Sequence, residues 1–496
     1  MKERVASAQL QNRIVSAQEA ARHIKDGMTV AFAGYTNCGY PKVIAKELVA
    51  RKQAGENLRF RYLAGAAIAP LDTMFAAENM VLWRAPLQES RELSKQINSG
   101  SVSYAEQQMV KLPRLVRDGA YGEIDVAVVE AIAITKDNGL VPTASVGMVP
   151  YFLEKAKGII IEVNTALPDA LNGMHDIFMP GFGSSRRVIP LTDVGERIGT
   201  PWIPFDPEKV LAVVQSDIPD ETPLPAEAKE EQVRAVNHLI SFLEQEVEKM
   251  PDGVLPPVQT GFGAMASEIV RGLQRSGLRD IRFFCGNMQE ANVELMKTDQ
   301  GKAATCGAIQ LTPKVMQMMR ETPELFRKKI VLRNTDITNG AEVCSRLGLV
   351  TLNSGIEMDI YGNVNSSHVS GTRVVNGLGG GASFAENAGL SVMLLVSENK
   401  GGKISTIVPM VPHQDICEHD IDVVVTENGV ADLRGLDDTG RARAIISHCA
   451  GPHYRDALAD YLDCASSLGG HHPQILEEAF SWHIRLKETG SMQLSS

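Results

Sequence analysis

Two glycine-rich turns have the composition of sites that hold phosphates or other anions. The first, QTGFGAM (259–265), precedes a helical pattern in which Met265, Ile269 and Leu273 share one face. A glycine pair before a helix lets the backbone approach a ligand closely, and the helix N-terminus favours negative charge. A Gly-x-Gly turn is more often only a tight connection, and the third glycine of a dinucleotide fingerprint is absent.

The second turn, NGLGGGASF (376–384), has four glycines in five residues. Such a backbone is free to present N–H groups to a ligand, although an ordinary loop explains it equally well. Shortly after it, Lys400 and Lys403 enclose two glycines on a hairpin-like loop. The two cations suit a phosphate and are equally ordinary on a surface.

Polar groups of other types offer weaker signals. The segment DITNG (336–340) ends an expected strand, where open α/β sheets place ligand groups, and the Asn339 amide could donate to a developing oxyanion. Asn-Gly is also a common turn, which is the simpler interpretation of this segment alone. His413, Asp415, Cys417, His419 and Asp420 have metal-ligand types, but their spacing matches no zinc pattern, so no metal site is predicted.

The sequence predicts that these groups are positioned by an open α/β fold. Apolar runs of strand length recur between helical or glycine-punctuated segments in the first half of the chain, which predicts parallel sheets covered on both faces. These runs are MTVAFAG (28–34), RFRYLAG (59–65), DVAVVEA (125–131), GIIIEVN (158–164) and VLAVVQS (210–216).

A proline-rich acidic segment, SDIPDETPLPAEAKEEQ (216–232), separates this series from a second one and predicts two domains, 1–220 and 230–496. A helix is predicted from about Val233, and helices again from Asp456 to Leu486. The strands predicted in the second series are RFFCG (282–286), IVLRNTDI (330–337), LVTLNSGIEMDIYG (349–362), LSVMLLVS (390–397) and DVVVTENG (422–429).

Composition excludes several classes of protein. The chain has 496 residues, enough for two large domains, and its net charge of −11 argues against a nucleic-acid binder. Seven scattered cysteines without a CxxC pair indicate reduced thiols and a cytoplasmic protein. We also expect no secretory signal and no membrane-spanning segment.

In its combination of segments, the sequence resembles the acetyl-CoA hydrolase/transferase branch of the class I CoA transferases. The resemblance runs almost end to end and in one order, which is far more specific than any single glycine motif. The segments that carry it are GYTNCGYPK (34–42), VPTASVG (141–147), GIIIEVN, QTGFG, IEMDIYGNVNSSHVSGTRVVNGLGGGASF (356–384), KGGKISTIVPM (400–410) and VVVTENGVADLRG (423–435).

The resemblance implies two open α/β domains of the class I CoA-transferase type, a homodimer, and coenzyme A bound mainly by the C-terminal domain. It also implies an oxyanion group at Asn339, assisted by backbone near Gly380. The implied contacts of coenzyme A are Gly261, Phe262, Gly263, Ala264, Met265, Ile356, Asn376, Gly380 and Lys400.

The family's central nucleophile has no counterpart. Such transferases use a glutamate that attacks the acyl-CoA and then carries the coenzyme as an enzyme thioester. The matching segment is CGNMQE (285–290), which places Gly286 at the glutamate position. Glycine has no side chain to acylate, so ordinary glutamyl chemistry is not expected there.

Three explanations for the missing glutamate remain open: another acid, a cysteine nucleophile, or a changed reaction. Glu290 or Glu294 could serve, although each lies about 6 to 12 Å further along a helix. Cys285 could be the nucleophile, since a thiolate needs only a lowered pKa, but its strand position equally suits a buried structural thiol. The fold could also keep coenzyme A binding and change the reaction to hydrolysis, C–C cleavage or decarboxylation.

The hypothesis is therefore an enzyme that acts on a small acyl-CoA, with a carboxylic acid as a possible second substrate, through altered chemistry. A conventional CoA-transferase of the succinyl-CoA:acetate type and a non-catalytic sensor of CoA thioesters are the alternatives. No metal, nucleic acid or membrane is expected to take part.

Overall fold

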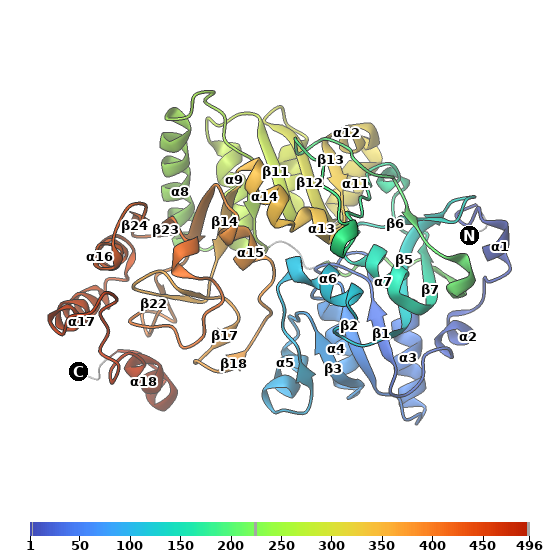
Figure 1. The fold of residues 1–496 in the computed structure, drawn as a ribbon, viewed down its shortest axis with the longest axis horizontal. Helices are drawn as coiled ribbons and strands as arrows, with labels where there is room; N and C mark the ends of the chain where they lie inside the picture. Colours follow the sequence, from blue (N-terminus) through green and yellow to red (C-terminus); the bar gives the residue numbers. More distant parts are fainter. Residues whose placement is uncertain (2, 223–225, 494–496) are drawn as a thin grey trace. The chain divides into compact units, whose positions relative to one another are not determined.

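The computed structural model describes residue 1, residues 3–222 and residues 226–493 (Figure 1). The chain packs into two units, Met1–Leu224 with Arg282–Arg346, and Pro225–Ile281 with Leu347–Ser496. Residues 223–225 of the predicted domain boundary lie outside the described residues. The assignment of 1–220 and 230–496 as domains stays a prediction.

The first unit contains a nine-stranded sheet whose central strands are parallel. The strands follow the order β4-β3-β2-β1-β5, β7 pairs with β5 and with β9, and β6 and β8 extend antiparallel from β5. The prediction of a parallel sheet is confirmed, and the five predicted runs are β1, β2, β5, β7 and β9. The strands are β1 (Thr29–Phe32), β2 (Phe60–Ala64), β3 (Val81–Ala85), β4 (Ser103–Tyr104), β5 (Ile124–Ile134), β6 (Gly139–Pro142), β7 (Ala156–Asn164), β8 (Ile203–Pro204) and β9 (Val210–Ser216).

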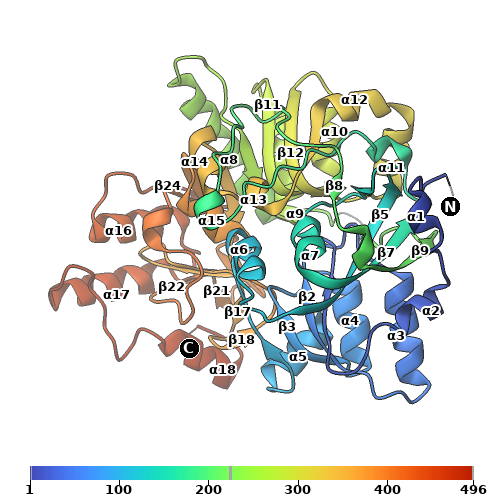
Figure 2. The same cartoon turned by 45° about the vertical axis from the view of Figure 1, so that its right-hand side comes forward.

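Helices cover this sheet through an aromatic core. Phe32 of β1 packs edge to face against Tyr62 of β2, and its ring also contacts Phe75 of α4. In both ribbon views α4 lies beside β2 and β3 (Figure 1, Figure 2). The helices before β9 are α1 (Ala8–Gln11), α2 (Ala17–Ala21), α3 (Val43–Gln53), α4 (Ala69–Ala77), α5 (Arg91–Asn98), α6 (Leu112–Arg117) and α7 (Val149–Lys155).

The later part of the first unit supplies a second run of neighbouring strands, β11 (Ile281–Met288), β12 (Gly301–Ile309) and β13 (Ile330–Leu332). The strand predicted over 330–337 ends early, because Thr335–Thr338 forms the one-turn helix α13. Asn339 therefore caps a short helix and does not end a strand. The other helices here are α10 (Glu290–Met296), α11 (Pro313–Glu321), α12 (Pro323–Lys329) and α14 (Ala341–Leu347).

The second unit contains parallel strands in the order β10-β14-β19-β23, and β24 is added antiparallel at the edge. The strand predicted over 349–362 is two strands, β14 and β15, because the chain turns after Ser354. The strands are β10 (Val258–Thr260), β14 (Val350–Ser354), β15 (Glu357–Asp359), β16 (Val364–Asn365), β17 (His368–Val369), β18 (Arg373–Val374), β19 (Leu390–Leu394), β20 (Glu398–Asn399), β21 (Ile404–Ser405), β22 (Ile407–Val408), β23 (Val423–Thr426) and β24 (Gly429–Asp432).

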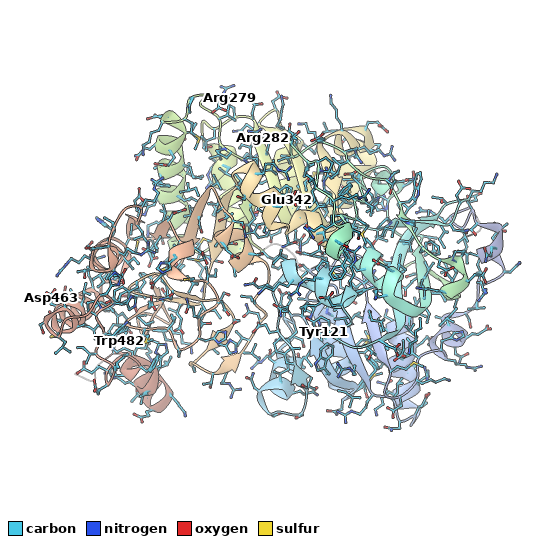
Figure 3. The ribbon with its side chains drawn as sticks, in the orientation of Figure 1. Tyr121, Arg279, Arg282, Glu342, Asp463 and Trp482 are labelled. Atoms are coloured by element: carbon cyan, nitrogen blue, oxygen red, sulfur yellow. The ribbon has the colours of Figure 1, made fainter. Side chains whose placement is uncertain are left out.

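The helix predicted from Val233 is α8, and the C-terminal helices are confirmed as two with a non-helical stretch between them. Trp482 of α18, labelled in Figure 3, packs against Tyr454 with ring centroids 5.2 Å apart. No helix among the described residues is long and apolar enough to span a membrane. The helices are α8 (Glu230–Glu248), α9 (Ala264–Arg275), α15 (Gly381–Glu386), α16 (Asp438–Cys449), α17 (Arg455–Ser467) and α18 (Ser481–Thr489).

Candidate active site

Gly286, on β11, faces the side chain of Tyr35. A Cβ atom placed on Gly286 would lie 2.6 Å from the Tyr35 hydroxyl oxygen, which is closer than side chains approach one another. Two further glycines border the same ring: a Cβ on Gly147 would lie 3.0 Å from its Cδ2 atom, and one on Gly307 would lie 3.6 Å from Cε2. Tyr35 therefore occupies the space that Gly286 and Gly147 leave open, and Gly307 lies at ordinary contact distance from its ring.

A tightly folded loop presents Tyr35. The backbones of Tyr35 and Cys38 exchange hydrogen bonds across a turn in which Thr36 and Asn37 both have positive φ angles. Gly39 has φ +61°, and its N–H donates to Asp220 at 3.0 Å. A side chain at Gly39 would collide with the hydroxyl of Ser145, so the loop needs glycine for two reasons.

A buried charge network fastens the end of this loop to the sheet. The Lys42 ammonium group lies 2.6 Å from Glu130 of β5 and 2.7 Å from Asp220. Glu162 of β7 accepts the backbone N–H of Lys42 at 2.8 Å and caps the start of α3. Burial raises the pKa of Glu130 to about 8 in spite of the adjacent lysine. One lysine thus faces three buried carboxyl groups.

Asn339 lies next to Tyr35 in the same unit. Its Oδ1 atom accepts hydrogen bonds from the Thr338 hydroxyl at 3.0 Å and from the Tyr35 hydroxyl at 3.4 Å. These two donors fix the orientation of the amide. Its Nδ2 group is buried and has no partner among the described residues. Burial raises the pKa of Tyr35, so its hydroxyl stays protonated and acts as a donor.

Cys285 lies on the other face of β11. Successive strand residues point to opposite sides, so the Cys285 thiol faces away from the side on which Gly286 meets Tyr35. Cys285 is fully buried, and Cys306 of β12 lies near it, with a thiol pKa that burial raises well above its usual value. This arrangement is typical of structural thiols.

Glu290, the first residue of α10, is held by a hydrogen bond and an ion pair. Its Oε2 atom accepts the Thr312 hydroxyl at 2.5 Å, and its Oε1 atom lies 3.4 Å from the Lys314 ammonium group. Glu294 pairs with the same lysine. Both carboxylates that the sequence offered as nucleophiles are therefore engaged with Thr312 or Lys314.

The second unit brings the two glycine-rich turns together around the end of β14. The Gly261 N–H donates to the Leu352 carbonyl at 3.3 Å, and the next residue, Asn353, lies against Gly381. The Asn353 Nδ2 group is buried and has no partner among the described residues. An unpaired donor between two glycine turns fits a ligand that carries acceptor groups.

The first turn is open. Strand β10 ends at Thr260 and α9 begins at Ala264, with Gly263 at φ +101° between them. No atom lies within 4 Å of a Cβ placed on Gly261 or Gly263, and Phe262 is exposed. Met265 is buried on the inner face of α9, so it supports the turn from within.

The other predicted contacts of coenzyme A also lie in the second unit. Gly380 caps α15, and the Asn376 amide donates to the Ser366 carbonyl at 2.9 Å. Ile356 stands between β14 and β15. Lys400 lies in the turn of the β20–β21 hairpin, exposed and without a hydrogen bond or ion pair within the described part of the chain.

The histidine-rich segment forms local pairs. His413 lies 2.9 Å from Asp415, and its ring stacks on His368. Within residues 3–222 and 226–493, Glu418, Asp438 and His472 also bring potential ligand atoms within 4.8 Å of one another.

Sequence reasoning missed Tyr35 and Asn353. Tyr35 lies in GYTNCGYPK, which carried part of the resemblance, but its role depends on two distant glycines that no local pattern connects to it. Asn353 follows a predicted strand, and position at the carboxyl end of a parallel strand was a usable signal for it.

Comparisons with known proteins identify the family of the chain. The acetyl-CoA hydrolase/transferase N-terminal domain matches residues 1–215, and the C-terminal domain matches residues 314–462. A succinyl-CoA:acetate CoA-transferase of Clostridium kluyveri is 37% identical, over 99% of this chain and 92% of its own length. An acetyl-CoA hydrolase of Kluyveromyces lactis is 36% identical, over 100% of this chain and 98% of its own length.

Solved structures share the fold. RipA from Yersinia pestis superposes with a TM-score of 0.72 at 19% identity, covering 93% of this chain and 98% of that one. A 4-hydroxybutyrate CoA-transferase from Porphyromonas gingivalis gives a TM-score of 0.62 at 19% identity, covering 92% and 98%. With the relatives above, these findings show that the chain belongs to the acetyl-CoA hydrolase/transferase family of enzymes.

Proposed function

We propose that this chain hydrolyses a small acyl-CoA thioester and does so without a glutamyl relay. The observation that carries the proposal is the 2.6 Å separation between a Cβ at Gly286 and the Tyr35 hydroxyl. A glutamate at this position has no room while Tyr35 is in place. The site is therefore organised around a tyrosine where the family's transferases use a carboxylate.

Asn339 supplies the electrophilic assistance in this proposal. Its buried, unpaired Nδ2 group donates to the thioester carbonyl oxygen, and Tyr35 and Thr338 hold the opposite end of the amide. Water adds to the carbonyl carbon, the C–S bond breaks, and the thiolate leaves and takes up the proton that water releases. Coenzyme A is held by Gly261 to Met265, Ile356, Asn376, Gly380 and Lys400.

The other reaction classes have less support. A cysteine mechanism needs the Cys285 thiol on the Gly286 side of β11, and strand alternation places it on the other side. A relay through Glu290 requires that carboxylate to leave Thr312 and Lys314. A conventional CoA-transferase remains the second candidate, because the Clostridium kluyveri relative bears that name. A homodimer in the cytoplasm, working without a metal, is proposed from the resemblance alone.

The test compares acetyl-CoA in water with succinyl-CoA plus acetate. We expect thioester loss at a rate independent of acetate, with no covalent coenzyme A after borohydride treatment. Acetate-dependent formation of acetyl-CoA together with a borohydride-trapped enzyme thioester would establish the transferase instead. Binding of acyl-CoA without consumption would identify a sensor and would equally reject the proposal.

A further inference from the structure

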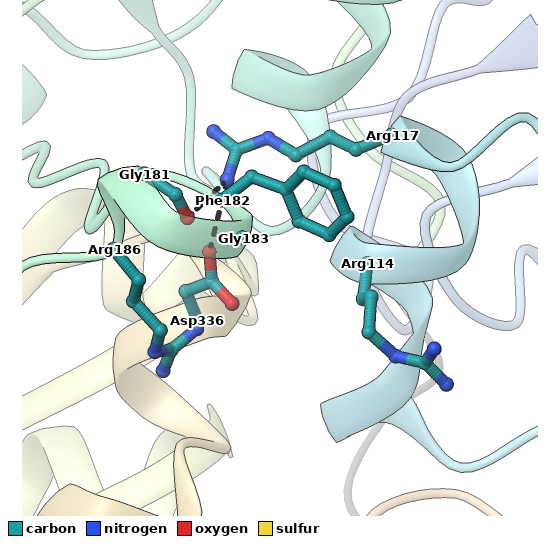
Figure 4. A pocket seen from close by; sticks show the side chains of 7 residues that line it. All are labelled: Arg114, Arg117, Gly181, Phe182, Gly183, Arg186 and Asp336. Atoms are coloured by element: carbon teal, nitrogen blue, oxygen red, sulfur yellow. Dashed lines mark hydrogen bonds and ion pairs between the residues drawn. The ribbon is translucent and has the colours of Figure 1, made fainter.

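An arginine-lined pocket opens in the first unit. Its volume is about 260 Å³, and it is lined by Arg114, Arg117, Gly181, Phe182, Gly183, Arg186 and Asp336. In Figure 4, Arg114 and Arg117 extend from α6, while Arg186 approaches from the loop that carries Phe182. A water molecule occupies about 30 Å³ in the liquid, so the pocket holds a small ligand with its waters and is below the usual range for a cofactor-sized one.

Arg117 is a structural part of the pocket wall. Its guanidinium group bonds Glu154 at 3.0 Å and the Gly181 carbonyl at 3.0 Å, and it lies over the Tyr151 ring. It also lies 3.8 Å from Asp336. Because these groups satisfy Arg117, its charge is largely compensated within the protein.

The other two arginines are not compensated in this way. Arg114 has one long ion pair with Asp118, 3.4 Å apart, and its side chain is 60% exposed. The Arg186 guanidinium group forms no hydrogen bond or ion pair within residues 3–222 and 226–493. Asp336 is the only carboxylate in the lining; it accepts the Tyr151 hydroxyl at 2.9 Å, and burial raises its pKa. The pocket therefore carries an excess of positive charge.

The loop GFGSSRR (181–187) is shaped to leave this pocket open. Gly181 has φ +85°, and a side chain there would lie 2.7 Å from the Ser185 carbonyl oxygen. The Ser185 hydroxyl donates to the Phe182 carbonyl at 2.7 Å, which closes the turn. The Phe182 ring, 44% exposed, is thereby held at the pocket as an apolar wall beside the cations.

We propose that this pocket binds a small anion, a carboxylate or a phosphate group, between Arg114 and Arg186. Guanidinium groups match the oxygen pairs of both anions. Asp336 precedes Asn339 by three residues across α13, so their Cβ atoms lie about 5–6 Å apart and the anion would sit close to the candidate active site. The inference goes beyond the proposed function, because it requires no thioester chemistry.

Calorimetric titration of the full chain with inorganic phosphate and with malonate, in the absence of coenzyme A, tests the site. The variants are Arg186→Gln and Arg114→Gln, and the matched control is Arg187→Gln. Arg187 neighbours Arg186 but packs over Phe178 and does not line the pocket. We expect Kd to rise about tenfold in each pocket variant and to stay unchanged in the control. Equal binding in all four proteins, or no binding of either anion, would overturn the site.

A second titration with coenzyme A and 3′-dephospho-coenzyme A separates the two sources of the anion. If Arg186→Gln weakens binding of coenzyme A but not of the dephospho compound, the pocket receives the 3′-phosphate of coenzyme A, and the thioester at the far end of that molecule cannot lie at Asn339. If it leaves both affinities unchanged while phosphate or malonate binding is lost, the ligand is a free anion. Either result supports the site, and the phosphate and malonate titrations decide it whether or not the proposed hydrolysis occurs.

Discussion

The hydroxyl oxygen of Tyr35 lies 2.6 Å from the point where Gly286 would carry a Cβ atom. A side chain at position 286 would therefore overlap Tyr35. Glycine at 286 leaves room for the tyrosine hydroxyl and glycine at 147 leaves room for its ring, and the hydroxyl orients the Asn339 amide. Four predictions follow from this arrangement and from its surroundings.

Gly286→Ala should destabilise the protein by about 1–3 kcal/mol, because the new methyl group overlaps the Tyr35 hydroxyl. In Tyr35→Phe the nearest ring atom, Cζ, would remain 3.5 Å away, an ordinary contact. Chemical unfolding of the two single variants and the double variant should therefore show a favourable coupling of about 1 kcal/mol. Strictly additive effects would mean that the two residues do not share this space.

The double variant Tyr35→Ala with Gly286→Glu should acquire glutamyl chemistry. Removal of the ring makes room for the carboxylate, which can then attack an acyl-CoA. Borohydride should trap coenzyme A on this variant, and acetate should accept coenzyme A from succinyl-CoA. Tyr35→Ala alone is the control and should show neither. A double variant that folds but yields no enzyme thioester would contradict the assigned position of the nucleophile.

Asn339→Ala should lower kcat by about 10²–10³-fold, the usual effect of losing one oxyanion donor. KM should change little, because the coenzyme contacts proposed here lie elsewhere. Cys285→Ala, a substitution on the opposite face of β11, should keep kcat within a few-fold. If Cys285→Ala abolished activity while Asn339→Ala kept it, the thiol would be the nucleophile and the assignment would be reversed.

His175 should contribute a loss of stability as the pH drops from 6.5 to 4. Burial lowers the pKa of His175 from 6.5 to about 4, while its ring lies 2.9 Å from the Thr143 carbonyl. Below pH 6.5 the His175 side chain therefore takes up a proton in the unfolded chain but not in the folded protein. This difference lowers the free energy of unfolding by up to about 3 kcal/mol at pH 4.

His175→Gln keeps a donor toward Thr143 and should flatten this part of the pH profile of the unfolding free energy. The exposed His23, replaced by Gln in the same way, serves as the control. If the wild-type and His175→Gln profiles run parallel, His175 is not the group responsible.

The parallel sheets were predictable because β1, β5 and β7 are continuous apolar runs, which indicate strands buried on both faces. The one-turn helix before Asn339 was not, because Thr335–Thr338 is polar and too short to show helical periodicity. The break after Ser354 was hidden because only two residues, Gly355 and Ile356, separate β14 from β15.

The glycine at position 286 could be read from the sequence, but its contact with Tyr35 could not, because contacts between distant segments leave no local pattern. The partners of Glu290 are hidden for the same reason, since Thr312 and Lys314 follow two elements later.

The close contact between position 286 and Tyr35 also limits which substitutions the protein can accept in evolution. A glutamate introduced at position 286 would overlap the Tyr35 hydroxyl and could not reach a substrate. Loss of the Tyr35 side chain alone would leave a cavity in the interior of the protein. A change to glutamyl chemistry at this position would thus require two coordinated replacements, each harmful when it occurs first. Steric overlap alone would therefore hinder any single-step change between a hydrolase of this kind and a glutamyl transferase.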